Sequence, residues 1–178
     1  MPRIPYQNLP EDDVTEAVRA RRGGEITPLD KLLAHSIHLL AGWNSLLGAV
    51  RGELSIGQHV IELIALRVAV INGAGYEWAA HLPLGTRSGL AEEVISALLE
   101  RSPRGFASPE IESVVRATDE LTVDARLSEA TFEQLRHYFD ERGLVEVIAV
   151  IATYNMVSRV LVGLDLTERD RSAAKGSS

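Results

Sequence analysis

Apolar residues recur at helical spacing along most of this chain, and no segment keeps the strict apolar–polar alternation of a half-buried strand. Aromatic residues are only 5% of the sequence, so Leu, Val, Ile and Ala must form most of the core. The most strand-like run is 145–151, but its apolar period continues through Tyr154, Val157 and Val160, and a helix fits that length better. The pattern predicts an all-α fold.

Local start and stop signals divide this pattern into helices. Ser55 followed by Gln58 resembles a capping box, and Ser108 before Pro109 is a typical helix start. Gly42 and Gly48 are the expected points of division or bending in the first long segment. The expected helices cover residues 29–50, 55–71, 76–84, 91–99, 109–121, 128–139 and 144–162.

The length and composition are those of one folded domain. The chain has 178 residues, of which 46% are apolar and 24% are charged, and these values exclude global disorder. We expect an N-terminal extension over residues 1–28, a helical domain over 29–166 and a disordered tail over 167–178. The net charge of −7 disfavours nucleic acid as a partner.

Several classes of chemistry and location are excluded or disfavoured. With no cysteine, the chain has no disulfide, no thiolate nucleophile and no cysteine–metal site. The N-terminus lacks an apolar signal core, and the most apolar run, 60–71, is interrupted by charges and too short to cross a bilayer. We therefore expect a cytoplasmic protein with no membrane partner.

Glu77 and His81 are the first candidates for chemistry. They are four residues apart, so on a helix their side chains share one face. An ionised Glu77 would raise the pKa of His81 and burial would lower it, so the imidazole could act as a general acid or base near neutral pH. From spacing alone, an ordinary pair on a helix surface is the simpler interpretation.

Glu62 strengthens the case for a site. It lies in the run 60–66, where nearly every helix face is apolar, so the helix is expected to be buried all round. A buried carboxylate needs a partner. Arg67 lies about 140° away from Glu62 around the helix, so it is poorly placed to be that partner within the same helix. A tight turn at 72–75 would fold Glu77 and His81 back against Glu62; a structural pair with an arginine elsewhere is the equal alternative.

The same residues resemble a known family. Glu62, the segment Leu66-Arg67-Val68-Ala69 and the segment Tyr76-Glu77-Trp78-Ala79-Ala80-His81 are similar to the core motif of the carboxymuconolactone decarboxylase family, to whose superfamily the alkylhydroperoxidase D proteins belong. The resemblance runs from about Leu32 to Leu164. It includes Ser88-Gly89-Leu90, Asp119-Glu120-Leu121 and Tyr154-Asn155-Met156.

The resemblance implies an all-helical, single-domain bundle that assembles as a trimer or a dimer of trimers. It also implies a decarboxylase, as in the catabolism of aromatic compounds, or a related lyase or isomerase, acting without a cofactor on a small carboxylated lactone or unsaturated oxo acid. Two positions that hold redox cysteines in the peroxidase branch correspond here to Ala74 and Glu77. Thiol-dependent peroxide reduction is therefore not expected of this chain.

The resemblance suggests His81 as proton donor, Glu77 as the group that orients it and Glu62 as a group that shares the proton or positions the substrate. Tyr76, Trp78 and Arg67 are the candidate substrate-binding residues. Two alternatives remain open: a hydrolase or isomerase of unknown substrate, and a catalytically silent or ligand-binding helical oligomer.

The remaining histidines are weaker candidates. His35 and His38 are three apart, but two histidines without a third ligand do not form a metal site, so we favour structural or surface roles and predict no metal. His59 lies three residues before Glu62, and we favour an exposed first turn of the helix for it.

Overall fold

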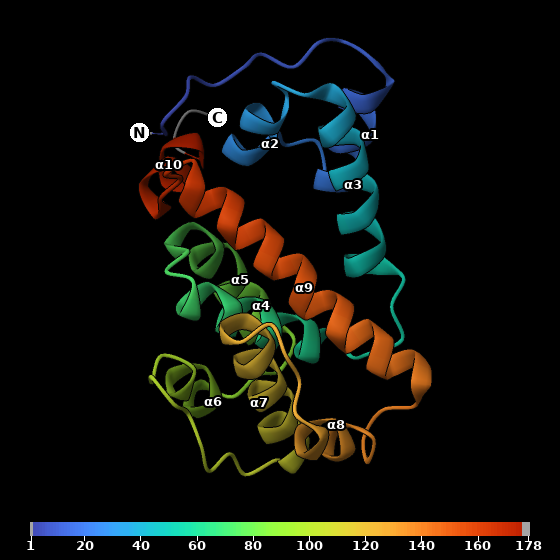
Figure 1. Ribbon diagram of the computed structural model, residues 1–178. Coiled ribbons are helices and arrows are strands. Elements are labelled where there is room, and N and C mark those ends of the chain that lie inside the picture. The colour runs from blue at the N-terminus through green and yellow to red at the C-terminus, as the bar shows by residue number, and fades with distance from the viewer. Residues whose placement is uncertain (1, 176–178) are drawn as a thin grey trace. The chain divides into compact units, whose positions relative to one another are not determined.

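The computed structural model describes residues 2–175, with side chains to residue 172, and this part of the chain contains ten helices and no strand (Figure 1). The all-α prediction is therefore confirmed. The helices are α1 (Asp13–Arg22), α2 (Pro28–Leu33), α3 (Ile37–Gly52), α4 (Gln58–Ile71), α5 (Gly75–Arg87), α6 (Glu92–Ala97), α7 (Pro109–Val123), α8 (Glu129–Leu135), α9 (Glu141–Gly163) and α10 (Glu168–Lys175).

The helices group into two compact units. One joins the described residues up to Leu54 to those from Gly163 onward, and the other contains residues 55–162. The predicted partition at residues 28 and 166 remains a prediction. The tail predicted to be disordered from residue 167 contains α10, whose first turn is closed by Asp170 accepting bonds from the backbone and side chain of Thr167. Residues 176–178 of that tail lie outside the described residues.

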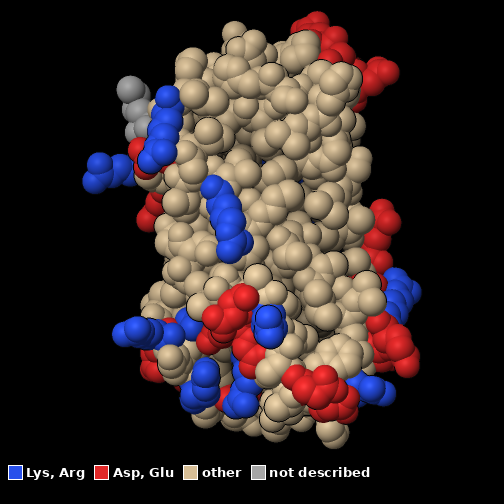
Figure 2. Space-filling view, viewed as in Figure 1, with Lys and Arg blue, Asp and Glu red and all other residues tan. Residues whose placement is uncertain are grey.

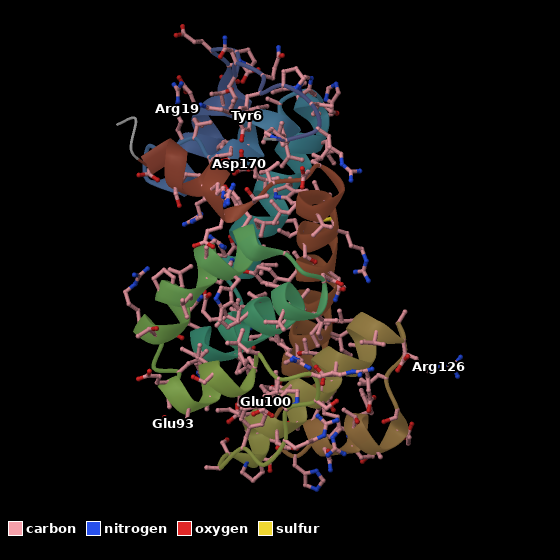
Figure 3. All side chains as sticks on the ribbon, turned by 90° about the vertical axis from the view of Figure 1, so that its left-hand side faces the viewer. Tyr6, Arg19, Glu93, Glu100, Arg126 and Asp170 are labelled. Carbon is pink, nitrogen blue, oxygen red and sulfur yellow. The ribbon has the colours of Figure 1, made fainter. Side chains whose placement is uncertain are left out.

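In the first unit, the helix expected over 29–50 is divided, but not at a glycine. Thr27 and Asp30 form a capping box with Pro28 in the first turn, so a short helix, α2, begins there. Ser36 then adopts extended backbone, and the ring of His35 contacts the carbonyl of Pro5 at 2.9 Å. Tyr6 of the N-terminal segment also donates a bond to Asp170 of α10 (Figure 3).

In the second unit, α4 is the central helix. Every residue from Val60 to Ala69 is buried, as the apolar run predicts, and α4 packs mainly on α5 and α7. Gly73 has φ +67°, a conformation that favours glycine, and it turns the chain directly from α4 into α5. This tight turn brings the first turns of α5 back over the middle of α4.

The predicted capping box at Ser55 is wrong. The N-cap of α4 is Gly57, which has no side chain to offer, and Ser55 lies two residues too early. The Ser55 hydroxyl and the amides of Ser55 and Ile56 instead donate to one carboxylate oxygen of Glu146 on α9, at 2.7, 2.7 and 3.1 Å. Burial by itself raises the pKa of Glu146, but these bonds and one from Arg142 outweigh it and lower that pKa to about 2.

We expect Glu146→Gln to destabilise the protein by about 1–3 kcal/mol at neutral pH, because an amide cannot accept these bonds as a carboxylate does. A carboxyl whose folded pKa lies below its unfolded value stabilises the fold above the unfolded pKa, and this stabilisation disappears as pH falls toward the folded pKa. The difference between variant and wild type should therefore shrink as pH falls from 4.5 to about 2.

Urea unfolding at a series of pH values measures this difference directly. Glu133→Gln, at an exposed ion pair on α8, is the matched control and should change stability little. A deficit for Glu146→Gln that stays constant down to the lowest pH would contradict the assigned role of its ionised form.

Helix α9 is the longest helix of the described chain. It is also the one helix in that part of the chain that is long and apolar enough, by length and composition, to cross a membrane. Of its most apolar window, 56% is buried inside the structure, as in a core helix of a soluble protein. From α9, Tyr154 reaches the side chain of His81 and Asn155 reaches that of Asn72.

Candidate active site

His81 lies between two carboxylates. Its Nδ1 is 2.6 Å from Glu62 Oε2 on α4, and its Nε2 is 3.0 Å from Glu77 Oε1, one turn earlier on α5. The exposed fractions are 0% for His81, 1% for Glu62 and 5% for Glu77. The turn at Gly73 brings His81 against Glu62, and the four-residue spacing on α5 brings His81 beside Glu77. We call these three residues the acid–imidazole cluster.

The two contacts differ in kind. The Nδ1 contact with Glu62 is a hydrogen bond, and a carboxylate oxygen and a deprotonated ring nitrogen both present lone pairs, so this bond needs a proton between its two atoms. The Nε2 contact with Glu77 is within ion-pair distance. The imidazole therefore has a carboxyl group beside each of its two ring nitrogens.

Two further residues contact the cluster and were not predicted as site residues. Gln58 donates from Nε2 to Glu62 Oε1 at 2.6 Å, so the second oxygen of Glu62 is also engaged. Tyr154 places its ring edge-on to His81, with centroids 5.0 Å apart and an interplanar angle of 85°. The four-residue spacing of Gln58 and Glu62 was a usable signal. Tyr154 belongs to a segment of the family resemblance, but its contact with His81 is set by the packing of α9 and has no signal in the local sequence.

The predicted aromatic residues flank the cluster along the chain. Tyr76 is buried, with 3% of its surface exposed, whereas Trp78 is half-buried. Both lie in the first turn of α5 beside Glu77. Their proposed contact with a substrate remains a prediction.

Arg67 has a different environment from the one expected of a substrate-binding residue. Its guanidinium forms a two-pronged contact with Asp119 on α7, at 2.6 and 3.1 Å. It also donates to the backbone carbonyls of Leu98, Glu100 and Arg101. Only 2% of Arg67 is exposed. Arg67 therefore ties α4 to α7 and to the end of α6, and its donors are occupied by the protein.

A pocket of about 530 Å³ lies on the side of Arg67 and Asp119, where Leu99 and Arg104 also line it. No residue of the acid–imidazole cluster lines this pocket. Within the part of the chain that has described side chains, no group of three or more His, Asp or Glu residues is arranged to hold a metal ion. Of the two partners left open for Glu62, the structure has the His81 side of α5 and not an arginine, and Glu62, Glu77 and His81 form one buried cluster.

Comparison with protein families identifies the region that carries the cluster. Residues 38–120 match the model described as the carboxymuconolactone decarboxylase family. A curated relative, the uncharacterized protein YdfG of Bacillus subtilis, is 24% identical over 125 residues, which are 69% of this chain and 82% of YdfG.

Solved structures show the same fold. An uncharacterized peroxidase-related protein from Ralstonia eutropha JMP134, with an alkylhydroperoxidase AhpD core, has a TM-score of 0.76 at 19% identity, covering 93% of this chain and 90% of its own. The debrominase Bmp8, solved in complex with 2,3,4-tribromopyrrole, has a TM-score of 0.76 at 17% identity, covering 98% of this chain and 97% of its own. The predicted alkylhydroperoxidase D-like fold is confirmed.

Proposed function

We propose that this chain, whose residues 38–120 match the carboxymuconolactone decarboxylase family model, is a cofactor-independent enzyme that moves a proton with the acid–imidazole cluster. The proposed substrate is a small carboxylated lactone or unsaturated oxo acid, and the proposed reaction is loss of CO₂. The chain has no cysteine, so the reaction does not use a thiol of this chain.

The observation that carries this proposal is the pair of short contacts on the two ring nitrogens of His81. If His81 and Glu77 were an ordinary pair on a helix surface, one ring nitrogen of His81 would face water. If His81 served only to hold two helices together, one carboxyl partner would be enough. Two acids on one buried imidazole instead form a group in which a proton can move between the ring and a carboxyl. General acid catalysis requires such a proton within hydrogen-bond reach of the reacting atom.

The proposed step is balanced by one proton. The bond between the ring carbon and the carboxylate breaks, CO₂ leaves, and the electron pair of that bond passes into the unsaturated lactone. The cluster then delivers one proton to carbon, and water restores that proton to the cluster. Because the cluster is buried, its charges act in a region of low polarity, where they influence a developing charge more strongly than they would in water.

Gln58 connects the cluster to solvent. It is exposed, and it donates directly to the buried Glu62. We therefore propose that substrate approaches by way of Gln58. A substrate group that replaces its amide on Glu62 must itself be a hydrogen-bond donor, since Glu62 Oε1 accepts the bond.

We expect His81→Gln and Glu77→Gln to lower kcat for CO₂ release by about 100-fold or more, the usual contribution of a positioned acid or base. Carboxymuconolactone and related oxo acids form the substrate panel. Each variant is assayed at a temperature at which circular dichroism shows it to be folded.

Glu146→Gln is the matched control, because it also neutralises a buried carboxylate, but one that binds Ser55 and Arg142 and lies outside the acid–imidazole cluster. It should retain wild-type kcat under folded conditions. Equal activity of wild type and His81→Gln would remove His81 from the mechanism.

A catalytically silent protein is the second candidate, and the near-complete burial of His81 and Glu62 favours it. In that case the cluster only joins α4 to α5. Wild type would then show no turnover on any member of the panel, while the cluster variants would still lose stability.

A further inference from the structure

The pocket of about 530 Å³ beside Arg67 and Asp119 is separate from the candidate active site. It is lined by the end of α4, by the segment 99–104 that follows α6 and by the last turns of α7, and we call it the α7 pocket. Every residue that lines it belongs to the unit of residues 55–162. Its volume is typical of pockets that hold small organic molecules.

Part of the α7 pocket is apolar and open to solvent. Val70 and Ile71, in the last turn of α4, are half-buried. Leu99 is 60% exposed and Val123 is 68% exposed, and these two side chains come from different segments but line the same pocket. An apolar group bound between them would remove this surface from water, and such burial is favourable.

Charged side chains of both signs also line the α7 pocket. They are Arg67, Glu100, Arg101, Arg104, Asp119, Glu120 and Asp124. Figure 2 shows basic and acidic side chains close together over the lower part of the view, where Figure 1 has α6 and α7. Three of these groups are engaged by the protein: Arg67 and Asp119 bind each other, and Glu120 accepts bonds from Ser128 and Thr131.

The other four charged groups are available to a ligand. Among the described residues, the exposed side chains of Glu100, Arg101 and Asp124 form no hydrogen bond or ion pair. The side chain of Arg104 is 51% exposed, and its ion-pair distance to Asp119 is 3.7 Å. Both arginines belong to the segment after α6, whereas Asp124 is the C-cap of α7. The pocket therefore offers positive and negative groups on different walls.

We propose that the α7 pocket binds a free apolar α-amino acid. The carboxylate of the ligand binds Arg101 and Arg104, because guanidinium–carboxylate hydrogen bonds are strengthened by both charges. The ammonium group binds Asp124 and Glu100. The apolar side chain covers Leu99 and the surface beside it.

The two signs of charge select a zwitterion. An anion would pair with the arginines but bring its charge near two carboxylates, and an organic cation would do the reverse. A zwitterion complements both walls at once. A polar amino acid would leave the apolar part of the pocket in contact with a group that prefers water.

The test is a titration of the full chain with L-phenylalanine, followed by the amide chemical shifts of the isotope-labelled protein. These shifts give the Kd and also locate the ligand. They should change in the segment 99–104 and at the end of α7. Phenethylamine, which lacks the carboxylate, and hydrocinnamate, which lacks the ammonium group, should each bind about tenfold more weakly or worse, because each loses one set of charged hydrogen bonds. Glycine, which lacks the apolar body, should also bind more weakly.

Two charge reversals test the two walls separately. Arg101→Glu and Asp124→Lys should each weaken binding of L-phenylalanine by about tenfold or more. Arg101→Glu should not weaken binding of phenethylamine, and Asp124→Lys should not weaken binding of hydrocinnamate, because each analogue lacks the group that the reversed residue binds. Both side chains are exposed, so both variants should fold, as circular dichroism would show.

Control variants carry the same reversals outside the pocket. Arg126→Glu matches Arg101→Glu, and Glu129→Lys matches Asp124→Lys; both residues are exposed and neither lines the α7 pocket. Arg126 extends outward from the turn before α8 (Figure 3). Both controls should bind L-phenylalanine like wild type.

Three outcomes would overturn the proposal. The first is no saturable binding of L-phenylalanine in the millimolar range. The second is binding of hydrocinnamate or phenethylamine as tight as that of L-phenylalanine, because one set of charges would then be unused. The third is binding that Arg101→Glu leaves unchanged and that shifts the amides around the acid–imidazole cluster, because the amino acid would then occupy the candidate active site.

Discussion

Replacing His81 by alanine should destabilise the protein by about 3–5 kcal/mol at neutral pH, the usual cost of removing one partner from a buried ionic group. The change leaves Glu62 and Glu77 facing each other in the core, where either charge needs a partner. It also removes the ring that packs edge-on against Tyr154. Chemical unfolding at neutral pH gives the free energy.

A fully apolar version provides the matched control. Changing Glu62, Glu77 and His81 together to leucine removes every charge of the cluster at once. Because well-packed apolar replacements of buried ionic groups are often neutral or stabilising, this variant should be more stable than His81→Ala while having no activity. The comparison separates the stability cost of the cluster from its proposed catalytic use.

The second large effect is expected at Arg67. Arg67→Met should cost about 3–5 kcal/mol, because it leaves three carbonyl groups without their donor and the Asp119 carboxylate with only Arg104, at 3.7 Å. Arg67→Lys should be intermediate, since an ammonium cannot reproduce the planar two-pronged contact with Asp119. Thermal and urea unfolding measure both variants.

Two comparisons test the assignment of Arg67. Arg136→Met, at an exposed pair with Glu133, should change stability by no more than about 0.5 kcal/mol. The double variant Arg67→Met with Asp119→Leu should be less destabilised than the sum of the two single variants, because neither partner is then left alone. If Arg67→Met instead kept its stability and raised KM, Arg67 would be the substrate-binding residue predicted from the sequence.

Much of the fold could be predicted because its signals are local. The apolar period of α4 specifies a helix buried on all sides, and Ser108 with Pro109 marks the start of α7 as the structure has it. The helix boundaries that were predicted wrongly depend on contacts with residues elsewhere in the chain. The first long helix divides at Ser36, where the neighbouring His35 contacts Pro5, and both glycines expected to divide it lie inside α3.

The candidate site likewise has features that local sequence predicts and features that depend on distant partners. The sequence by itself determined that Glu77 and His81 share a helix face, since four residues make about one turn, and that Glu62 needs a partner, since its helix is apolar on every side. Only the tertiary structure decided which partners meet. Arg67 binds Asp119, which lies 52 residues later in the chain, and Ser55 binds Glu146, which lies 91 residues later. Such contacts depend on the directions in which helices cross, and these arise from packing of the whole core and not from the pattern of any one segment.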